Sequence, residues 1–367
     1  MILTNLLQSD FWMKMNLIEA PENFTNESTF EGIPANKGFY FPAEFAEHEA
    51  TWLSWPHNSD TWPGKIETIY KSYCEFIKLV AEGEKVNINV RDKAMAEDAF
   101  TKIQKAGADM SQVFFYVNPT NDAWCRDHGP AFLLNKESNE KIIVDWGYNA
   151  WGGKYPPFDL DDVIPTRIAH QLKLPVSHPE IVMEGGSVEF NGKGTVLTTT
   201  ACLLNENRNP HLTKKQIEEY LKNYYGVTNI LWLGDGILGD DTDGHIDDLT
   251  RFVNEDTVVT VVEEDESDEN HIPLTENLEL LKSLKLEDGS PINIIELTMP
   301  KARYYQGQRL PMSYANFYIA NKYVIAPVFG DPNDEKALEI LQACFPTRKV
   351  VGIDSSDLIW GLGSFHC

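Results

Sequence analysis

Hydrophobic and polar positions change their period several times along the chain, which predicts short strands alternating with amphipathic helices. Residues 50–55 and 85–90 have the composition and alternation of strands, and residues 66–82 between them have the period of a helix. A second helix over 94–106 leads to a strand over 113–117. The first part of the chain therefore predicts an α/β unit.

From residue 131 the chain repeats one arrangement, in which two strands of a hairpin are followed by a helix and a third strand. These elements are expected at 131–134, 142–145, 163–171 and 181–183; at 187–190, 195–198, 214–224 and 230–233; at 249–253, 257–262, 274–284 and 293–297; and at 315–320, 323–328, 334–345 and 349–353. With the looser first unit, the pattern occurs about five times. Such recurrence favours a closed or stacked repeat architecture.

Residues 1–37 lack a clear period, so we expect an irregular extension there and a single domain over 38–367. The chain carries 56 acidic side chains against 31 lysines and arginines, a formal net charge of −25. A surface of this charge repels nucleic acid and anionic membranes. It tolerates a small cationic substrate, although solubility alone also explains such a charge.

The cysteines and the N-terminus indicate a reducing, cytoplasmic setting. Five cysteines without CxxC spacing argue against a disulfide framework and a thiolate zinc site. Residues 1–15 have a short apolar patch with no basic stretch before it, so we expect no signal peptide. No apolar run approaches the ~20 residues that span a bilayer.

Residues 239–248 are the most unusual stretch, with five aspartates, two glycines and one histidine. Like charges this close are unfavourable unless they are solvated or bind a cation. If an extended strand begins here, His245 and Asp247 share one face, which places a titratable base beside a fixed negative charge. The ordinary alternative is a solvated acidic turn.

The repeat places polar residues at equivalent positions. Asp127, Glu184 and Asp247 each precede the hairpin of a unit, and Cys367 follows the last strand. In a ring of repeats such positions converge on the axis. Each residue alone has an ordinary structural explanation, but a cysteine, a histidine and three carboxylates together form a chemical set. A thiolate needs a neighbouring base such as His245, and carboxylates bind a guanidinium through paired hydrogen bonds. The set indicates attack on an amidine or guanidine carbon.

Several motifs give the sequence a close resemblance to the agmatine deiminases, a family that includes bacterial peptidylarginine deiminases within the guanidine-modifying superfamily. The motifs are residues 42–45 (PAEF), 48–52 (HEATW), 122–130 (DAWCRDHGP), 184–187 (EGGS), 203–210 (LLNENRNP), 242–247 (TDGHID) and 361–367 (GLGSFHC). The resemblance runs from about residue 38 to the end. It implies the α/β pentein fold, with five ββαβ units in a pseudo-fivefold propeller.

The resemblance also implies a role for each candidate residue. Cys367 matches the nucleophile and His245 the general acid and base, while Asp127 and Asp247 match the carboxylates that bind the guanidinium. Glu184 matches the acid that supports substrate and histidine, and Trp124 an aromatic beside the alkyl chain of the substrate. Agmatine would give N-carbamoylputrescine and ammonia, in polyamine biosynthesis. No metal or organic cofactor is implied, and a homodimer is common among such proteins.

One departure from the family pattern is that the chain ends at Cys367, where relatives continue for several residues. A carboxylate beside the thiol is expected to raise the pKa of the thiol and to impair the enzyme.

Other functions are compatible with some of the same residues. A peptidylarginine deiminase or a free-arginine deiminase would use the same chemistry. A binuclear manganese ureohydrolase is suggested by Asp243, His245 and Asp247, which resemble its Asp-x-His-x-Asp run, whereas Gly244 is wrongly spaced for a calcium-binding EF-hand loop. A repeat scaffold that binds a polyamine-like cation without turnover is the non-enzyme alternative.

Overall fold

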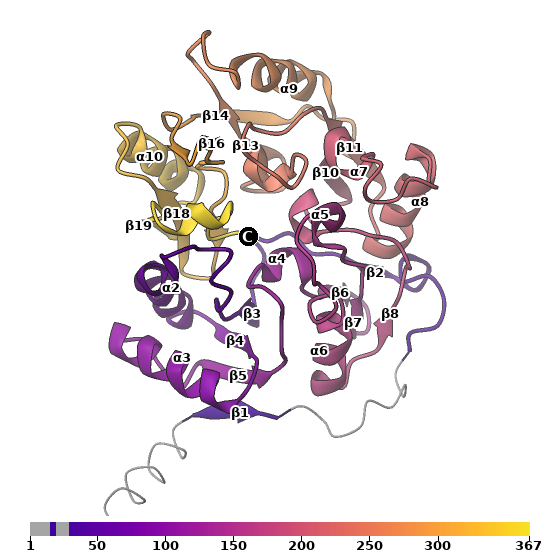
Figure 1. Cartoon of the computed structure of the whole chain (residues 1–367). Coiled ribbons are helices and arrows are strands. Elements are labelled where there is room, and N and C mark those ends of the chain that lie inside the picture. The colour runs from indigo at the N-terminus through magenta and orange to yellow at the C-terminus, as the bar shows by residue number, and fades with distance from the viewer. Residues whose placement is uncertain (1–14, 20–28) are drawn as a thin grey trace, which may run out of the picture.

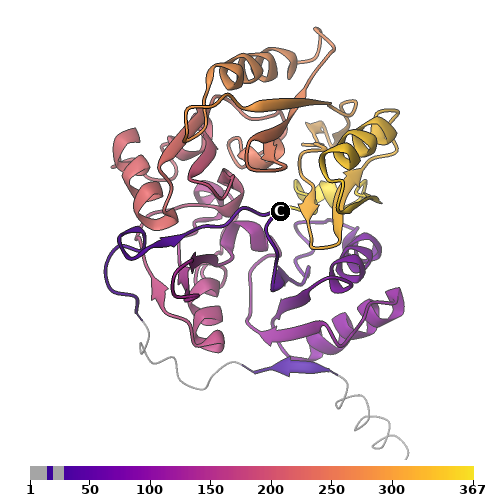
Figure 2. The ribbon, with the colours of Figure 1, turned by 180° about the vertical axis from the view of Figure 1, so that it is seen from behind.

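The structure, a computed structural model, describes residues 15–19 and 29–367. The expectation about a signal peptide concerns residues 1–15, nearly all of which lie outside the described part. Figures 1 and 2 show the sheets surrounding the C-terminus, with the longer helices on the periphery. The end of the chain, which carries Cys367, therefore lies near the middle of the molecule.

The first sheet consists of parallel strands joined by helices. Its strands are β1 (Asn16–Ile18), β3 (Ala50–Ser54), β4 (Lys85–Val90) and β5 (Val113–Val117), in the order β1-β5-β4-β3. Helices α2 (Ile66–Ala81) and α3 (Lys93–Ala106) make the crossovers that parallel neighbours require. This unit is βαβαβ, which corrects the expectation of five ββαβ units. In addition, β1 forms a strand within the segment expected to be irregular.

Each of the other four units consists of an antiparallel pair of strands, then a helix, then a third strand that pairs parallel to the second strand. Their elements are β6 (Ala131–Asn135), β7 (Lys141–Val144), α6 (Ile164–Leu172) and β8 (Val176–Ser177); β9 (Val188–Phe190), β10 (Thr195–Thr199), α8 (Lys214–Tyr225) and β11 (Asn229–Leu233); β12 (Thr250–Phe252), β13 (Thr257–Val262), α9 (His271–Ser283) and β14 (Asn293–Thr298); and β17 (Tyr318–Ile319), β18 (Tyr323–Val328), α10 (Asp334–Cys344) and β19 (Lys349–Asp354). The predicted order of elements is present in these four units.

Short elements fill the connections. They are β2 (Phe39–Tyr40), which pairs with β6; the hairpin β15 (Tyr304–Tyr305) and β16 (Gln308–Arg309); the one-turn helices α4 (Cys125–His128) and α7 (Thr200–Leu203); α5 (Ala150–Gly153), a single turn with left-handed backbone angles; and the 3-10 turns η1 (Ala35–Lys37), η2 (Gly185–Ser187), η3 (Ile246–Asp248) and η4 (Leu358–Gly361). Three of these, α4, η2 and η3, carry or adjoin predicted site residues.

Two predicted strands differ strongly from the structure. The third strand of the second unit is β8 and not 181–183, where Val182 forms only an isolated bridge with Gly147. Ile181 and Met183 are apolar because they are buried in a core cluster, not because they extend a sheet. The predicted strand over 315–320 is reduced to β17, because the carbonyls of Ala315 and Phe317 accept hydrogen bonds from the Arg251 guanidinium.

Local sequence signals explain where the longer helices begin and end. Asp92 caps α3 by accepting a hydrogen bond from the amide of Met95, and Thr213 forms a capping box with Gln216 at the start of α8. Both helices end at a glycine with left-handed backbone geometry. These boundaries follow from residue chemistry alone.

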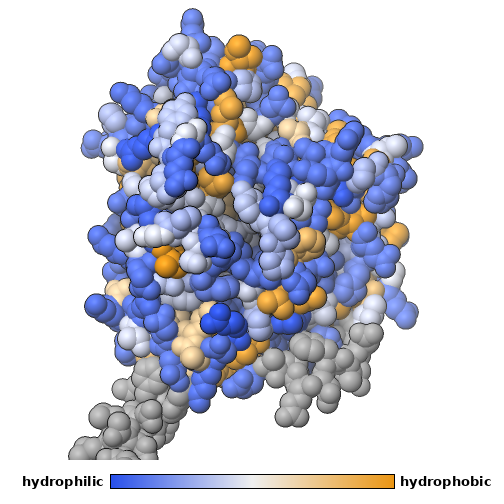
Figure 3. Space-filling view, in the orientation of Figure 1, coloured by the Kyte–Doolittle hydropathy of each residue, from blue (hydrophilic) through white to orange (hydrophobic). Residues whose placement is uncertain are grey.

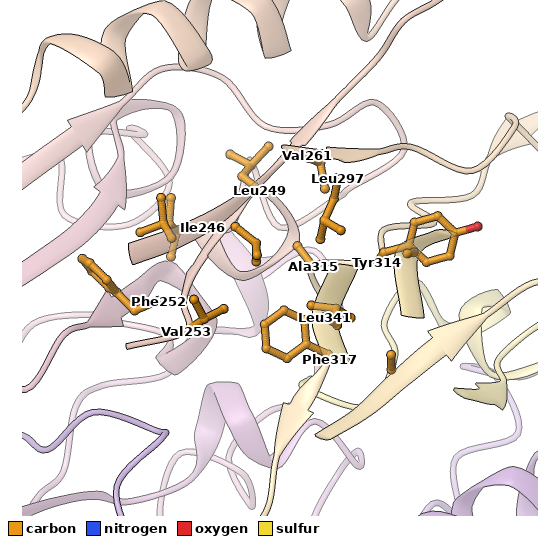
Figure 4. Close-up of a cluster of buried hydrophobic side chains, with 14 of the residues drawn as sticks. Ile246, Leu249, Phe252, Val253, Val261, Leu297, Tyr314, Ala315, Phe317 and Leu341 are labelled. Atoms are coloured by element: carbon orange, nitrogen blue, oxygen red, sulfur yellow. The ribbon is translucent and has the colours of Figure 1, made fainter. Parts of the chain in front are cut away.

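The hydrophobic core is divided into clusters between the sheets and their helices. Figure 4 shows the cluster between the last two units, where Phe252, Leu297, Phe317 and Leu341 meet. In β4, Val86, Ile88 and Val90 pack in the cluster beneath α2 and α3, while Asn87 and Asn89 alternate with them and point to the opposite face. These asparagines are also buried, so both faces of this strand are covered and one of them is polar.

Hydrophilic side chains dominate the face seen in Figure 3, and apolar side chains are scattered over it. Within residues 15–19 and 29–367, no helix is both long enough and apolar enough to cross a membrane.

Candidate functional site

Three loops bring the predicted carboxylates and the histidine together around Gly186. Asp127 lies in α4, Gly186 in η2, and His245 and Asp247 lie at η3. A Cβ atom at Gly186 would lie 2.5 Å from His245 Nδ1, 2.8 Å from Asp127 Oδ1 and 3.1 Å from Asp247 Oδ2. No side chain fits at this point, so glycine allows the three groups to converge. The extended strand considered at His245 and Asp247 is wrong, because residues 246–248 form the turn η3, and the predicted strand over 249–253 is shortened to β12.

Asp127 and His245 form a buried pair of titratable groups. Asp127 Oδ1 accepts a hydrogen bond of 2.9 Å from the amide of Gly186 and lies 3.6 Å from His245 Nδ1. Burial raises the pKa of Asp127, while His245 opposes that increase. Burial alone would lower the pKa of His245, but Asp127, Cys202 and Asp247 together hold this pKa well above its usual value. The acids around His245 therefore favour its protonated form.

Asp247 is oriented by His366, the residue before the candidate nucleophile. His366 Nδ1 lies 2.7 Å from Asp247 Oδ2, and its Nε2 lies 2.5 Å from Glu44 Oε2. Because each ring nitrogen faces a carboxylate oxygen, both can donate when the imidazole is protonated. Burial tends to raise the pKa of Asp247, but the hydrogen bond and charge of His366 keep this pKa below its usual value.

Glu184 is held by Arg208 in the interior. Arg208 Nε donates a hydrogen bond of 2.6 Å to Glu184 Oε1, and both side chains are fully buried. The same guanidinium also donates 2.6 Å to Asp243 Oδ2 and 2.8 Å to the carbonyl of Thr242. A buried carboxylate needs such a partner, because an unpaired one is strongly destabilising.

Three buried polar atoms at this site lack a hydrogen-bond partner within the described structure: Glu184 Oε2, His245 Nε2 and Asp247 Oδ1. Buried polar atoms are normally paired, so each exception needs an explanation. Two carboxylate oxygens are suitable acceptors for the N–H donors of a planar cation. The site therefore has free capacity for a guanidinium group.

The alternative metal run does not gather on one point. Asp243 faces Arg208 and also Lys154, whose ammonium lies 2.7 Å from Asp243 Oδ1, while Asp247 faces His366. A different set could hold a metal ion, because Glu184, Cys202 and His245 each offer one ligand atom within 4.8 Å of the others. A second set, Glu44, Glu189 and His366, has the same spacing and contacts Arg251 through both carboxylates.

Cys367 lies next to these acids in an environment that disfavours its thiolate. Asn316 Nδ2 donates 3.1 Å to the sulfur and 3.0 Å to Asp248 Oδ1. Desolvation raises the pKa of the Cys367 thiol well above its usual value, and the charges of Asp247, Asp248 and Asp127 raise it further. A cation bound among these acids would offset their charges and favour the thiolate.

Alkylation of Cys367 by neutral iodoacetamide is expected to be slow at pH 7 and to accelerate with rising pH beyond pH 9. The reason is that the raised thiol pKa leaves little thiolate at neutral pH, and the thiolate is the reactive form. Mass spectrometry of the C-terminal peptide gives the rate for this cysteine alone. A rate that reaches its plateau below pH 8 would contradict the predicted environment.

A cavity of about 790 Å³ reaches Cys367, Asp127 and Trp124 from the surface. The Trp124 ring packs against Trp62 with centroids 5.2 Å apart. A Cβ at Gly363 would lie 2.5 Å from the Trp124 ring and 2.9 Å from Cys367 Cβ. The aromatic ring therefore lies close to the candidate nucleophile. The acidic side chains that line the cavity besides Asp127 are Asp60, Asp122, Asp161 and Asp241.

The structure thus places all six predicted residues at one site, Glu184 because one of its carboxylate oxygens lies within 4.8 Å of a ring nitrogen of His245. It adds Glu44, Arg208, His366, Asn316 and Trp151, whose roles the sequence analysis did not assign. Glu44, Arg208 and His366 do occur inside the motifs that carried the resemblance. Neither Asn316 nor Trp151 lies in one of those motifs.

Comparison with known proteins identifies the same family. The family model for Porphyromonas-type peptidyl-arginine deiminases matches residues 40–367. A protein of Legionella pneumophila (strain Paris), provisionally named as an agmatine deiminase, is 39% identical over 338 residues, which are 91% of this chain and 95% of that protein.

Solved structures agree with this result. The agmatine deiminase of Enterococcus faecalis is 32% identical, with a TM-score of 0.84 over 92% of this chain and 97% of that one. A cysteine-to-serine variant of the agmatine deiminase of C. jejuni, with substrate bound, is 36% identical, with a TM-score of 0.81 over 94% and 97% of the two chains. The mixed α/β fold is therefore that of solved agmatine deiminases.

Proposed function

Because the chain belongs to the family of Porphyromonas-type peptidyl-arginine deiminases, we propose that it hydrolyses the guanidinium group of agmatine to N-carbamoylputrescine and ammonia. The observation that carries this proposal is the free acceptor capacity of Glu184 and Asp247 beside His245, whose partner Asp127 lines a cavity together with Cys367. A guanidinium fits this arrangement because its donors are planar and paired.

The proposed reaction proceeds in two halves. When the guanidinium binds, the Cys367 thiol loses its proton to solvent and its thiolate forms a bond to the guanidinium carbon. The C–N bond to one amino group then breaks as His245 protonates this group, which leaves as ammonia. The product of this half is an amidino-thioether. In the second half His245 removes a proton from water, and the resulting hydroxide attacks the same carbon. The C–S bond breaks to restore the thiolate, and the proton of the added hydroxyl group is released to solvent as the carbamoyl C=O forms.

The carboxylates supply binding and electrostatic stabilisation. Asp127 and Asp247 accept hydrogen bonds from the guanidinium and keep its carbon near the sulfur, which lowers the entropic cost of attack. The bound cation also offsets the negative charges that raise the pKa of the Cys367 thiol. Substrate binding is thereby coupled to formation of the nucleophile.

The lining of the cavity supports agmatine over arginine. The cavity is lined by the carboxyl groups of Asp122, Asp161 and Asp241. One lysine, Lys154, is among the described residues that line it, and this lysine is paired with Asp243. Agmatine ends in a primary amine, which carboxylates attract. Free arginine carries a carboxylate near that position, and placing like charges together costs several kcal/mol.

The test is turnover by the unmodified protein on three substrates: agmatine, free arginine and an N-acylated arginine amide that represents a peptide. We expect kcat/KM for agmatine to exceed that for arginine by about 10²-fold or more, the ratio that corresponds to roughly 3 kcal/mol. Equal values for agmatine and arginine, or a preference for the acylated substrate, would contradict the proposal.

We further propose that the five main sheets form a pentein propeller with pseudo-fivefold symmetry, as the circular arrangement in Figure 1 supports. We also propose that the protein works in the cytoplasm as a homodimer and serves polyamine biosynthesis.

A further inference from the structure

The loop that connects β7 to α6 contains a left-handed turn. Ala150, Trp151, Gly152 and Gly153 have φ angles of 53°, 55°, 87° and 78°. Glycine adopts such values readily, but an alanine followed by a tryptophan does so at a cost, because non-glycine residues usually visit this region singly. Strained backbone of this kind persists where surrounding contacts fix it, and it is frequent at functional sites.

Contacts on several sides fix this turn. Asn149 accepts a hydrogen bond of 2.8 Å from the amide of Gly152 and donates 3.0 Å to the carbonyl of Asn207. A Cβ at Gly152 would lie 2.4 Å from the Asn207 side chain, so the turn touches the loop that carries Arg208. The Trp151 ring is packed edge-on against Tyr148 and Tyr155, with centroids 5.5 Å and 5.8 Å away.

The result of this geometry is that the Trp151 indole faces Asp127. Trp151 Nε1 donates a hydrogen bond of 3.0 Å to Asp127 Oδ2, and the amide of Gly186 donates to Asp127 Oδ1. A carboxylate has about four acceptor positions, so one on each oxygen remains for a substrate. Both protein donors are rigid, one because it is backbone and the other because the turn and the tyrosines hold it.

We propose that Trp151 is a positioning residue of this site: the left-handed turn Ala150–Gly153 holds the indole N–H on Asp127, so that this carboxylate meets the guanidinium in a fixed orientation. The inference rests on the proposed function, because it concerns how the same site binds its guanidinium substrate. Trp151 acts through Asp127 and its own ring remains beside the cavity.

Trp151→Phe tests the proposal, because it keeps an aromatic ring and removes the N–H. We expect KM for agmatine to rise by about tenfold or more, equivalent to about 1.4 kcal/mol, because the lost hydrogen bond is one to a charged group. We expect kcat to change by less than about threefold. A purely structural role would instead lower the apparent kcat through loss of folded enzyme and leave KM unchanged.

Trp232→Phe is the matched control. Trp232 Nε1 also donates a hydrogen bond of 3.0 Å to a carboxylate, Glu218, but on β11 and α8, outside the cavity. The KM of Trp232→Phe for agmatine should equal that of the unmodified protein. An unchanged KM in Trp151→Phe, or an equal rise in both variants, would overturn the proposal.

A second pair of variants addresses the turn itself, and remains informative if Trp151→Phe does not fold. Gly153 and Gly289 have φ angles of 78° and 84°, and a Cβ at either position meets no atom within 4 Å. Alanine therefore strains both turns similarly without a clash. We expect a higher KM for agmatine only in Gly153→Ala; the same KM in both variants would count against a turn that positions Asp127.

Binding separates this inference from the proposed function. If the unmodified protein releases no ammonia from agmatine, the proposed function fails, while calorimetry still measures the affinity of the protein for agmatine. Trp151→Phe should then weaken this binding about tenfold relative to Trp232→Phe. Equal affinities of the two variants would overturn the role of Trp151 independently of turnover.

Discussion

Replacement of Cys367 by alanine is expected to reduce turnover of agmatine by about 10⁴-fold or more, because removal of the nucleophile in covalent catalysis leaves only binding and electrostatic effects. Binding of agmatine should survive, because the acceptors of Asp127 and Asp247 do not depend on the sulfur. Steady-state ammonia release and calorimetry with agmatine measure these two properties separately.

Cys344→Ala provides the control for this experiment. Cys344 ends α10, is half-buried, and lies outside the cavity that reaches Cys367. Burial raises the pKa of its thiol to about 11, so it is also a poor nucleophile at neutral pH. Turnover should be unchanged in this variant. Substantial activity in Cys367→Ala would mean that the sulfur is not the attacking atom.

Replacement of Asp127 by asparagine is expected to lower kcat/KM for agmatine by about 10²- to 10³-fold. The substitution preserves shape but removes the charge that faces both the guanidinium and His245, and truncating one partner of a buried charge pair costs about 2–5 kcal/mol. Most of the loss should appear in KM, because the interaction is already present when substrate binds. Kinetics over a range of agmatine concentrations give both constants.

Asp145→Asn removes a comparable carboxyl elsewhere. Asp145 accepts a hydrogen bond of 2.5 Å from Thr166, and burial raises its pKa to about 7, but it does not line the cavity. This variant should keep the kcat/KM of the unmodified protein. Similar losses in the two variants would show that Asp127 acts through general stability and not through the bound cation.

The sequence contained much of the fold because its periodic signals are local. The alternation in β4, the capping residues Asp92 and Thr213 and the hairpin, helix and strand order of four units all arise from neighbouring residues. The apolar run at 181–183 misled the prediction, because burial and strand formation give the same pattern over three residues. The first unit also differs, since helices follow both β3 and β4.

Part of the candidate site could be predicted from the sequence, because several of its residues occupy equivalent places in the repeated units. Asp127, Glu184 and Asp247 precede hairpins, so their convergence could be expected from the repeat. The partners that orient them could not, because the contacts are distant in the chain. His366 and Glu44 are 322 residues apart, and the Trp151 contact depends on backbone angles that no local pattern indicates.

The most direct test of the proposed function is product analysis of agmatine turnover by the unmodified protein with EDTA present. We expect one ammonia for each N-carbamoylputrescine, no urea, and a rate that EDTA leaves unchanged, because Cys367, His245 and the carboxylates supply all the groups that the proposed reaction uses. Formation of urea and putrescine, with loss of activity in EDTA, would contradict it and favour a metal-dependent ureohydrolase.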